Sequence, residues 1–355
     1  MKWVELKYSK NQIDKAGIFL VRESLDSVDK NNFFDAIEKL NNWRVAHAFP
    51  MQVIYVNLKR NTKLIDKNAL IVQRLKRLSS IYLKLKRENG MSLVRMEDIA
   101  GCRAIVNDLS KVYELYEILK KSLSKQVIHR ERDYIKNPKE SGYRGIHLIY
   151  KYFGDKTCYE NLPVEVQIRS KIQHSWATAV EVVGTFTKQA LKANRGEEKW
   201  LNFFKNVSKY FSYLETDKKL MPEDDRNNLK HETDDLNVYD VLSAFRVSTE
   251  QLTKDKSNKY HYFIIILDIK NRRIAFERFV RNEIEFASER YKILENEFRG
   301  DESKDLVLVS AKSLRDLKKS YPNYFADTEK FLKFLKIVIG QFNYSTSPKD
   351  SLEKN

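Results

Sequence analysis

Two segments near the middle of the chain have the apolar content of β-strands, residues 146–153 and 164–169. The second segment alternates strictly, and successive side chains of a strand point to opposite faces of a sheet. Its polar face carries a carboxylate, an amide and a guanidinium: Glu165, Gln167 and Arg169. Its apolar face suits packing against a core: Val164, Val166 and Ile168. An ordinary amphipathic strand with a solvated outside would show the same alternation, so the pattern alone does not predict a site.

Helical periodicity dominates most of the remaining chain up to residue 215. Residues 1 to about 70 are predicted to be helical because their apolar positions recur three and four residues apart. Residues 68–87 are predicted as one basic amphipathic helix with a buried stripe of Leu75, Leu78, Tyr82 and Leu85. A strand at 104–106 and helices at 112–123, 174–191 and 200–214 complete this part. The order of strand, helix, strand and strand predicts a mixed β-sheet flanked by helices, an α/β (α+β) fold.

The C-terminal part of the chain is predicted to form a second unit. Residues 216–236 are charged and polar, which is typical of a linker. Beyond them, the pattern predicts strands at 260–269, 273–279 and 306–309 and helices at 284–298, 313–321 and 327–338. The expected plan is therefore an N-terminal helical region (1–69), a mixed-sheet domain (70–215), a linker, a smaller C-terminal α/β domain (237–340) with a possible regulatory role and a disordered tail (341–355).

Composition narrows the class of protein. The formal net charge is +16, which favours a polyanionic partner or, equally well, a lysine-rich solvated surface. Two cysteines cannot build a disulfide framework or a four-thiolate zinc site. There is no long apolar run of membrane-spanning length and no signal-peptide pattern, so we expect a cytoplasmic protein with no membrane partner. The absence of a Gly-x-x-x-x-Gly-Lys-[Ser/Thr] loop argues against a P-loop NTPase.

The loop before residue 146 is the strongest candidate for chemistry. Pro138, Gly142 and Gly145 constrain its path, and three cations crowd it: Lys136, Lys139 and Arg144. Tyr143 lies among these cations. Cations and a planar ring beside a carboxylate suit a site that handles nucleotide phosphates through a metal ion, because the carboxylate holds the metal and the ring stacks on a base.

The residues of this loop and of the strand after it resemble the synthetase domain of the RelA/SpoT family. The matching residues are the run Asp133–Arg144, then His147, then Glu165–Arg169. Glu-Ser before Gly-Tyr, and Trp176-Ala177-Thr178 downstream, are closest to the small alarmone synthetases. Two further runs match: Arg-x-Lys-x-x-x-Ser-Ile-x-x-Lys from Arg74 to Lys84, and Asp-Ile-Ala-Gly-x-Arg from Asp98 to Arg103. The resemblance covers roughly residues 70–190.

This resemblance implies an enzyme that transfers pyrophosphate from ATP to the 3′ hydroxyl of GDP or GTP, making the alarmone (p)ppGpp. It implies that Asp98 and Glu165 hold Mg²⁺, that Glu165 also takes the hydroxyl proton, and that Arg103 contacts phosphate. The implied nucleotide-binding residues are Arg74, Lys76, Ser80, Lys84, Arg132, Lys139, Tyr143, His147, Gln167 and Arg169, with Tyr143 stacking on the acceptor base. The hydrolase His…His-Asp set of the long family members is not present, so synthesis without hydrolysis is expected.

Two other functions are compatible with the sequence. Some proteins similar to this family are toxins that modify the 3′ end of tRNA and serve in phage defence with a neutralising partner. The second alternative is an inactive nucleotide- or RNA-binding module. The expected partners are ATP, with GDP, GTP or tRNA as acceptor, and a neutralising or regulatory partner. A second copy of the chain is a further candidate.

Overall fold

The computed structural model describes residues 3–22, 30–88, 90–122, 126–187, 191, 194–216, 222–244, 260–268, 270–271, 273–280, 282–298, 301, 303–310 and 328–340. A five-stranded sheet forms its centre, in the order β1-β2-β5-β4-β3. The strands are β1 Leu70–Leu75, β2 Ala100–Val106, β3 Val127–Asp133, β4 Ile146–Lys151 and β5 Pro163–Ser170. β2 and β5 pair in parallel and the other pairs are antiparallel. The predicted mixed sheet flanked by helices is confirmed.

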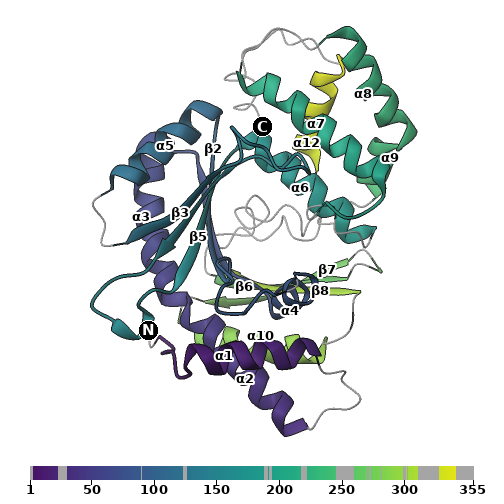
Figure 1. The fold of residues 1–355 in the computed structure, drawn as a ribbon. Coiled ribbons are helices and arrows are strands. Elements are labelled where there is room, and N and C mark those ends of the chain that lie inside the picture. The colour runs from purple at the N-terminus through teal and green to yellow at the C-terminus, as the bar shows by residue number, and fades with distance from the viewer. Residues whose placement is uncertain are drawn as a thin grey trace.

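One face of this sheet is apolar and covered by two helices. α3 (Ala48–Ile65) and α5 (Leu109–Lys121) pack on it, on the same side in Figure 1. The inward residues of β5 are Val164, Val166 and Ile168, and each is at most 1% exposed. α5 begins where the Asp108 side chain accepts a hydrogen bond from the backbone N–H of Lys111, an N-cap that satisfies a free helical donor. The polar residues of β5 must therefore lie on the opposite face.

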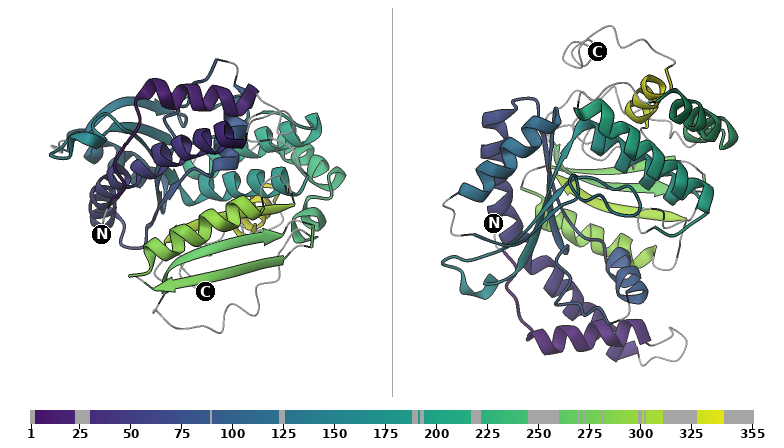
Figure 2. Two further views of the ribbon diagram at one scale, coloured as in Figure 1. Left: turned by 90° about the horizontal axis from the view of Figure 1, so that it is seen from below. Right: turned by 45° about the horizontal axis from the view of Figure 1, so that its top comes forward.

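The opposite face looks toward α6 (Lys171–Phe186), α7 (Glu198–Thr216) and the C-terminal strands, as Figures 1 and 2 show. α6 begins with a capping box, in which the Ser170 side chain accepts from the Gln173 backbone and the Gln173 side chain accepts from the Ser170 backbone. This motif ends β5 at Ser170 and turns the chain directly into the helix.

The N-terminal region is helical, as predicted. α1 (Lys10–Arg22), α2 (Lys30–Ala46) and α3 build a cluster with α4 (Leu78–Arg87) around Trp43, which is buried. His47, between α2 and α3, is buried and its Nδ1 lies 2.7 Å from the carbonyl oxygen of Trp43. Burial lowers the pKa of His47 to about 4, so this histidine is neutral and structural.

The single basic helix predicted over residues 68–87 is wrong. Residues Leu70–Leu75 form edge strand β1, and α4 spans only Leu78–Arg87. Pairing with β2 outweighs the helical spacing of the apolar residues, because the strand gains ladder hydrogen bonds that a local pattern does not reveal. The buried positions of α4 are Ile81 and Leu85, whereas Tyr82, expected in the core, is 37% exposed. Strand β3 was not predicted, since its residues are mostly polar and exposed.

In the C-terminal part, β6 (Tyr260–Asp268), β7 (Arg273–Val280) and β8 (Lys304–Ser310) form an antiparallel sheet in the order β7-β6-β8. α10 (Ile284–Glu297) packs on it, and α12 (Glu329–Val338) follows. These elements were predicted; the helix at 313–321 and the tail 341–355 lie outside the described residues. The predicted linker contains α8 (Glu223–Asp235), whose Leu229 and Thr233 are buried, and α9 (Val238–Ala244) follows it.

The C-terminal elements share a hydrophobic core with α6 and α7. That core runs from Val72 in β1 through the α7 aromatics to Val307, Val309 and α12. The ring of Phe331 lies 5.6 Å from that of Phe211 and 6.0 Å from that of Phe204. The boundary predicted at residue 237 therefore crosses a continuous core. None of the helices in the described ranges is long and apolar enough to cross a membrane.

A substitution that creates a cavity at Phe331 tests whether the C-terminal elements share one core with α6 and α7. Phe331→Ala removes a fully buried ring between α7 and α12 and should lower the free energy of unfolding by about 3–5 kcal/mol. Because Trp176 and Trp200 lie in the same core, their fluorescence should follow one denaturant transition shifted to lower concentration. An unshifted tryptophan transition in Phe331→Ala would show that the C-terminal elements fold separately.

Candidate functional site

The strand register places four of the predicted site residues in one row across the sheet. β3–β4 pairing sets Arg132 opposite His147, and β4–β5 pairing sets His147 opposite Gln167. The parallel β2–β5 pair sets Gln167 opposite Arg103. Residues paired between neighbouring strands share a face. Glu165 and Arg169 flank Gln167 on that same face, so residues separated by up to 66 positions meet on the polar side of the sheet.

Gln167 joins the charged groups of this row. Its amide oxygen accepts from Nε of Arg103 at 3.1 Å and from Nη2 of Arg169 at 2.9 Å. Its amide nitrogen donates to Oε2 of Glu165 at 2.7 Å. The shared face predicted for Glu165, Gln167 and Arg169 is therefore confirmed. The amide holds two guanidinium groups and one carboxylate at fixed positions relative to each other.

A chain of hydrogen bonds runs from Arg169 back to Glu165. Nε of Arg169 donates to the Tyr143 hydroxyl at 3.1 Å, and that oxygen lies 2.5 Å from Nε2 of His147. Nδ1 of His147 lies 2.8 Å from Oε1 of Glu165. Burial lowers the pKa of His147, against the opposing effect of the Glu165 carboxylate. A ring that donates from Nδ1 to Glu165 and accepts at Nε2 from the Tyr143 hydroxyl accounts for both contacts. Burial alone would raise the pKa of Glu165, but its contacts with His147 and Gln167 outweigh burial and hold that pKa below the usual range.

Tyr143 lies deeper than its predicted role requires. It is 3% exposed, with the Arg169 guanidinium 4.9 Å from its ring centroid and the Trp176 ring at 6.4 Å. The ammonium of Lys139 lies 5.3 Å from the Tyr143 ring and 4.5 Å from the ring of Tyr134, which is half-buried. Sequence reasoning did not select Tyr134, whose ring is the more accessible. Stacking of a base on Tyr143 remains a prediction that requires its neighbours to move.

Asp98 precedes β2 and binds two lysines. Nζ of Lys76 donates to one carboxylate oxygen at 2.8 Å, and Nζ of Lys84 donates to the other at 3.0 Å. Burial alone would raise the pKa of Asp98, but the two ammonium groups outweigh it and lower the pKa, against the opposing charge of Glu165. The structure therefore brings the two predicted metal carboxylates within electrostatic reach of each other. Ser80 lies half-buried in α4, and Arg74 lies on edge strand β1.

Positive charge exceeds negative charge in the interior of this site. Burial, together with Arg169 and Arg74, lowers the pKa of Arg103 to about 9. His174, at the start of α6, faces the same cations, and burial lowers its pKa well below the usual value. In the described part of the chain, neither ring nitrogen of His174 has a hydrogen-bond partner. Buried cations with few counter-charges favour binding of a polyanion such as a triphosphate.

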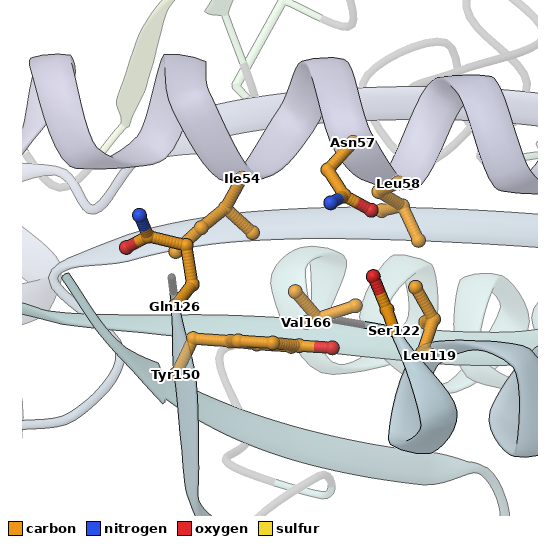
Figure 3. A pocket seen from close by; sticks show the side chains of 8 residues that line it. All are labelled: Ile54, Asn57, Leu58, Leu119, Ser122, Gln126, Tyr150 and Val166. Atoms are coloured by element: carbon orange, nitrogen blue, oxygen red, sulfur yellow. The ribbon is translucent and has the colours of Figure 1, made fainter. Parts of the chain in front are cut away.

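Arg132 lies at the exposed end of the row. It ion-pairs with Glu97 at 3.6 Å, and Arg130 pairs with the same carboxylate at 3.1 Å. Glu97 was not singled out as a site residue, and nothing in its local sequence marks it. A small pocket lies between α3 and the apolar face of the sheet and is lined by Ile54, Tyr150 and Val166 among others (Figure 3). It belongs to the apolar core beneath α3 and not to the site.

Comparison with known proteins identifies the region that carries this site. Residues 73–186 match the family described as the region found in RelA / SpoT proteins, and this match is called the RelA/SpoT region below. It is similar to GTP pyrophosphokinase YwaC of Bacillus subtilis (strain 168), 34% identical over 112 residues, which are 30% of this chain and 52% of that protein. It is also similar to probable GTP diphosphokinase RSH2, chloroplastic, of Oryza sativa subsp. japonica, 37% identical over 101 residues, which are 28% of this chain and 13% of that protein.

The match spans about half the length of the bacterial relative. Among solved structures, the chain is similar to small alarmone synthetase 1 from Bacillus subtilis bound to its product pppGpp. The identity is 25%, the match covers 51% of this chain and 94% of that one, and the TM-score is 0.44.

Proposed function

We propose that the chain is a GTP/GDP pyrophosphokinase, which moves the pyrophosphate group of ATP to the 3′ hydroxyl of GDP or GTP. The observation that carries the proposal is the single polar face on which Glu165, Gln167, Arg103 and Arg169 meet. This face lies within the RelA/SpoT region. In the reaction, the acceptor oxygen forms a bond to the β-phosphorus of ATP, the bond from that phosphorus to the α–β bridging oxygen breaks, and AMP leaves.

The cations of the site would position the triphosphate. Lys76 and Lys84 now share the carboxylate of Asp98, and they are near enough to this face to exchange that contact for phosphate oxygens. Arg103 and Arg169 are already fixed by Gln167, so they would meet charge developing on the transferred group without reorganising. Preorganised cations of this kind stabilise the transition state more than the ground state.

Glu165 would accept the proton of the acceptor hydroxyl. Its lowered pKa keeps it ionised at neutral pH, and the His147 and Gln167 donors fix its orientation. His147 and Gln167 each occupy one accepting position of the carboxylate, so it keeps an accepting lone pair for the hydroxyl.

Asp98 and Glu165 are suited to Mg²⁺, which would neutralise phosphate charge when bound. Both are oxygen donors and both have pKa values below the usual range, so both are ionised. Across the described ranges there is no group of three or more His, Cys, Asp or Glu side chains that could hold a metal. Two carboxylates suffice for Mg²⁺, since it commonly takes one or two from the protein and completes its shell with phosphate and water.

The proposal is tested with purified protein, Mg²⁺ and ATP labelled in its terminal phosphates. GDP, GTP and deacylated tRNA are offered in parallel, and label is followed into each acceptor. Label on the guanine nucleotide is the expected result. Label on tRNA alone would replace the proposal with the toxin-like alternative, and label on no acceptor, with ATP still bound, would replace it with a nucleotide-binding module.

Tyr143→Ala should weaken use of the acceptor more than binding of ATP. The variant removes the ring and also the hydroxyl that links Arg169 to His147. We expect KM for GDP or GTP to rise about tenfold or more, with KM for ATP changed less than threefold, as a lost stacking contact of about 1–3 kcal/mol predicts. Tyr143→Phe is the control that removes only the hydroxyl. Equal changes in both KM values for Tyr143→Ala would contradict acceptor recognition by this ring.

A further inference from the structure

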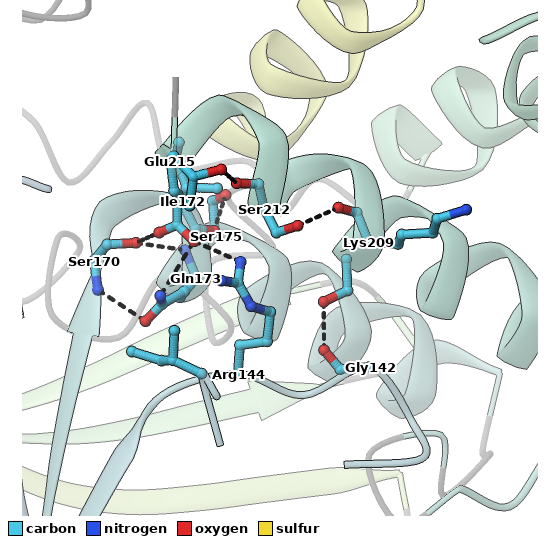
Figure 4. A network of polar contacts seen from close by, with 12 residues as sticks. Gly142, Arg144, Ser170, Ile172, Gln173, Ser175, Lys209, Ser212 and Glu215 are labelled. Atoms are coloured by element: carbon cyan, nitrogen blue, oxygen red, sulfur yellow. Dashed lines mark hydrogen bonds and ion pairs between the residues drawn. The ribbon is translucent and has the colours of Figure 1, made fainter. Parts of the chain in front are cut away.

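α7 lies beyond the RelA/SpoT region but holds two of its turns in place. Its side chains reach the loop that ends at Gly145 and the turn from β5 into α6, as Figure 4 shows. Ser208 donates to the carbonyl oxygen of Gly142. A Cβ added at Gly142 would lie 3.0 Å from Cα of Lys205, and the residue has φ +86°, so this close approach requires glycine. The backbone of α7 thus touches the loop directly.

Glu215, in the last turn of α7, contacts both turns at once. Its Oε2 accepts from Nη1 of Arg144 at 2.6 Å and from Nε2 of Gln173 at 3.2 Å. Its Oε1 accepts from the hydroxyl of Ser170, the N-cap of α6. The Glu215 side chain is 2% exposed and that of Arg144 is 8% exposed, so the ion pair is shielded from water. Charge-assisted hydrogen bonds in such a setting are short and directional.

Two partners of Glu215, Arg144 and Ser170, are sequence neighbours of residues in the site. Arg144 directly follows Tyr143, and Ser170 directly follows Arg169. Tyr143 and Arg169 are themselves joined by the hydrogen bond that starts the path to His147 and Glu165. One carboxylate therefore fixes the residue next to each end of that bond. A shift of Glu215 would move both ends relative to each other.

We propose that Glu215 is a positioning residue of the site, which sets the distance between the loop of Tyr143 and the strand end of Arg169. It acts through Arg144 and Ser170 and touches no reacting atom. The proposal rests on the proposed function, because the path it supports ends at Glu165. It gives α7 a specific role in transfer, in addition to its part in the core.

Glu215→Gln tests the proposal with little change of volume. The amide keeps a hydrogen-bonding oxygen but loses the charge that pairs with Arg144. Since misplacement of a site by about 1 Å can cost about 100-fold, we expect kcat for transfer to fall about 10- to 100-fold, with KM for ATP unchanged. Arg144→Gln should give the same loss, and the double variant should lose no more than either one, because both single variants break one ion pair.

Glu232→Gln is the matched control. Glu232 in α8 accepts a hydrogen bond from Asn206 of α7 at 2.7 Å, so this carboxylate joins α7 to α8 and not to the turns that Glu215 holds. It should leave kcat and both KM values unchanged. If Glu215 had only a structural role, Glu215→Gln would be less stable than the wild type but would keep the kcat and KM values of the control. That result would overturn the proposal.

Amide hydrogen exchange gives a readout that does not need the enzyme to be active. In Glu215→Gln, exchange at residues 142–147 should accelerate relative to the wild type and to Glu232→Gln, both without substrate. If the wild type shows no transfer to guanine nucleotides, the proposed function fails, while exchange still decides whether Glu215 holds the loop. Unchanged exchange in Glu215→Gln would overturn the positioning role.

Discussion

Glu165→Gln is expected to reduce pyrophosphate transfer by about 100- to 10,000-fold, the range associated with loss of a positioned proton acceptor. The amide can still receive one of the hydrogen bonds that Glu165 accepts from His147 and Gln167, so the fold should be kept. It cannot take a proton, and it is a poor ligand for Mg²⁺. Both roles proposed for the carboxylate are therefore lost together. The measurement is single-turnover transfer with saturating ATP and acceptor.

The control for this variant is Glu114→Gln. Glu114 is exposed on α5, on the far side of the sheet, so the same chemical change there should leave transfer unchanged. Circular dichroism and the denaturant midpoint of Glu165→Gln should remain close to those of the wild type. Wild-type turnover by Glu165→Gln would remove Glu165 from the site and would require another group to accept the proton.

Asp98→Asn is expected to reduce transfer by about 100-fold or more and to weaken its dependence on Mg²⁺ concentration. The change removes one of the two proposed metal carboxylates. It also removes the carboxylate that Lys76 and Lys84 share. The two effects can be separated, because a lost metal ligand raises the Mg²⁺ concentration needed for half-maximal rate, whereas unpaired lysines alter the affinity for ATP.

The double variant Asp98→Asn/Glu165→Gln tests whether the two carboxylates hold the same metal ion. If both carboxylates hold the same ion, the double variant should lose little more activity than the more severe single variant, since residues acting as a unit are non-additive. Multiplied losses would instead indicate that Asp98 and Glu165 act separately. An Asp98→Asn protein with wild-type rate and wild-type Mg²⁺ dependence would contradict its assignment as a metal ligand.

The sequence predicted the elements with strong local signals and missed those fixed by distant partners. β5 was predicted correctly because its period-two alternation reflects two different environments, a core on one side and the site on the other. The helical spacing of Leu75, Leu78, Tyr82 and Leu85 predicts a helix where β1 lies, because the pairing with β2 that decides its structure has no local signature. The residues of α8 read as a linker in the sequence because most of them are polar, and the helix buries only Leu229 and Thr233.

The candidate site shows the same limit. The family resemblance selected residues one by one, but their common row depends on the register of four strands, which no local pattern encodes. Tyr143 is buried because Trp176 and α7 pack around it. The sequence of its own loop, which is rich in glycine and lysine, does not predict that burial. Glu215 lies 71 residues from Arg144, and its surroundings in the sequence resemble any helix end.

The core shared by α7 and α12 has a consequence for synthesis of the chain on the ribosome. Phe204 and Phe211 are covered in part by Phe331, and α12 is among the last described segments to be translated. A nascent chain that has completed α7 leaves the part of those rings that Phe331 covers exposed until residues 329–338 have emerged. We therefore expect chaperones that bind exposed aromatic surface to recognise the nascent protein, and we expect its site to reach a stable shape only after residues 329–338 have emerged.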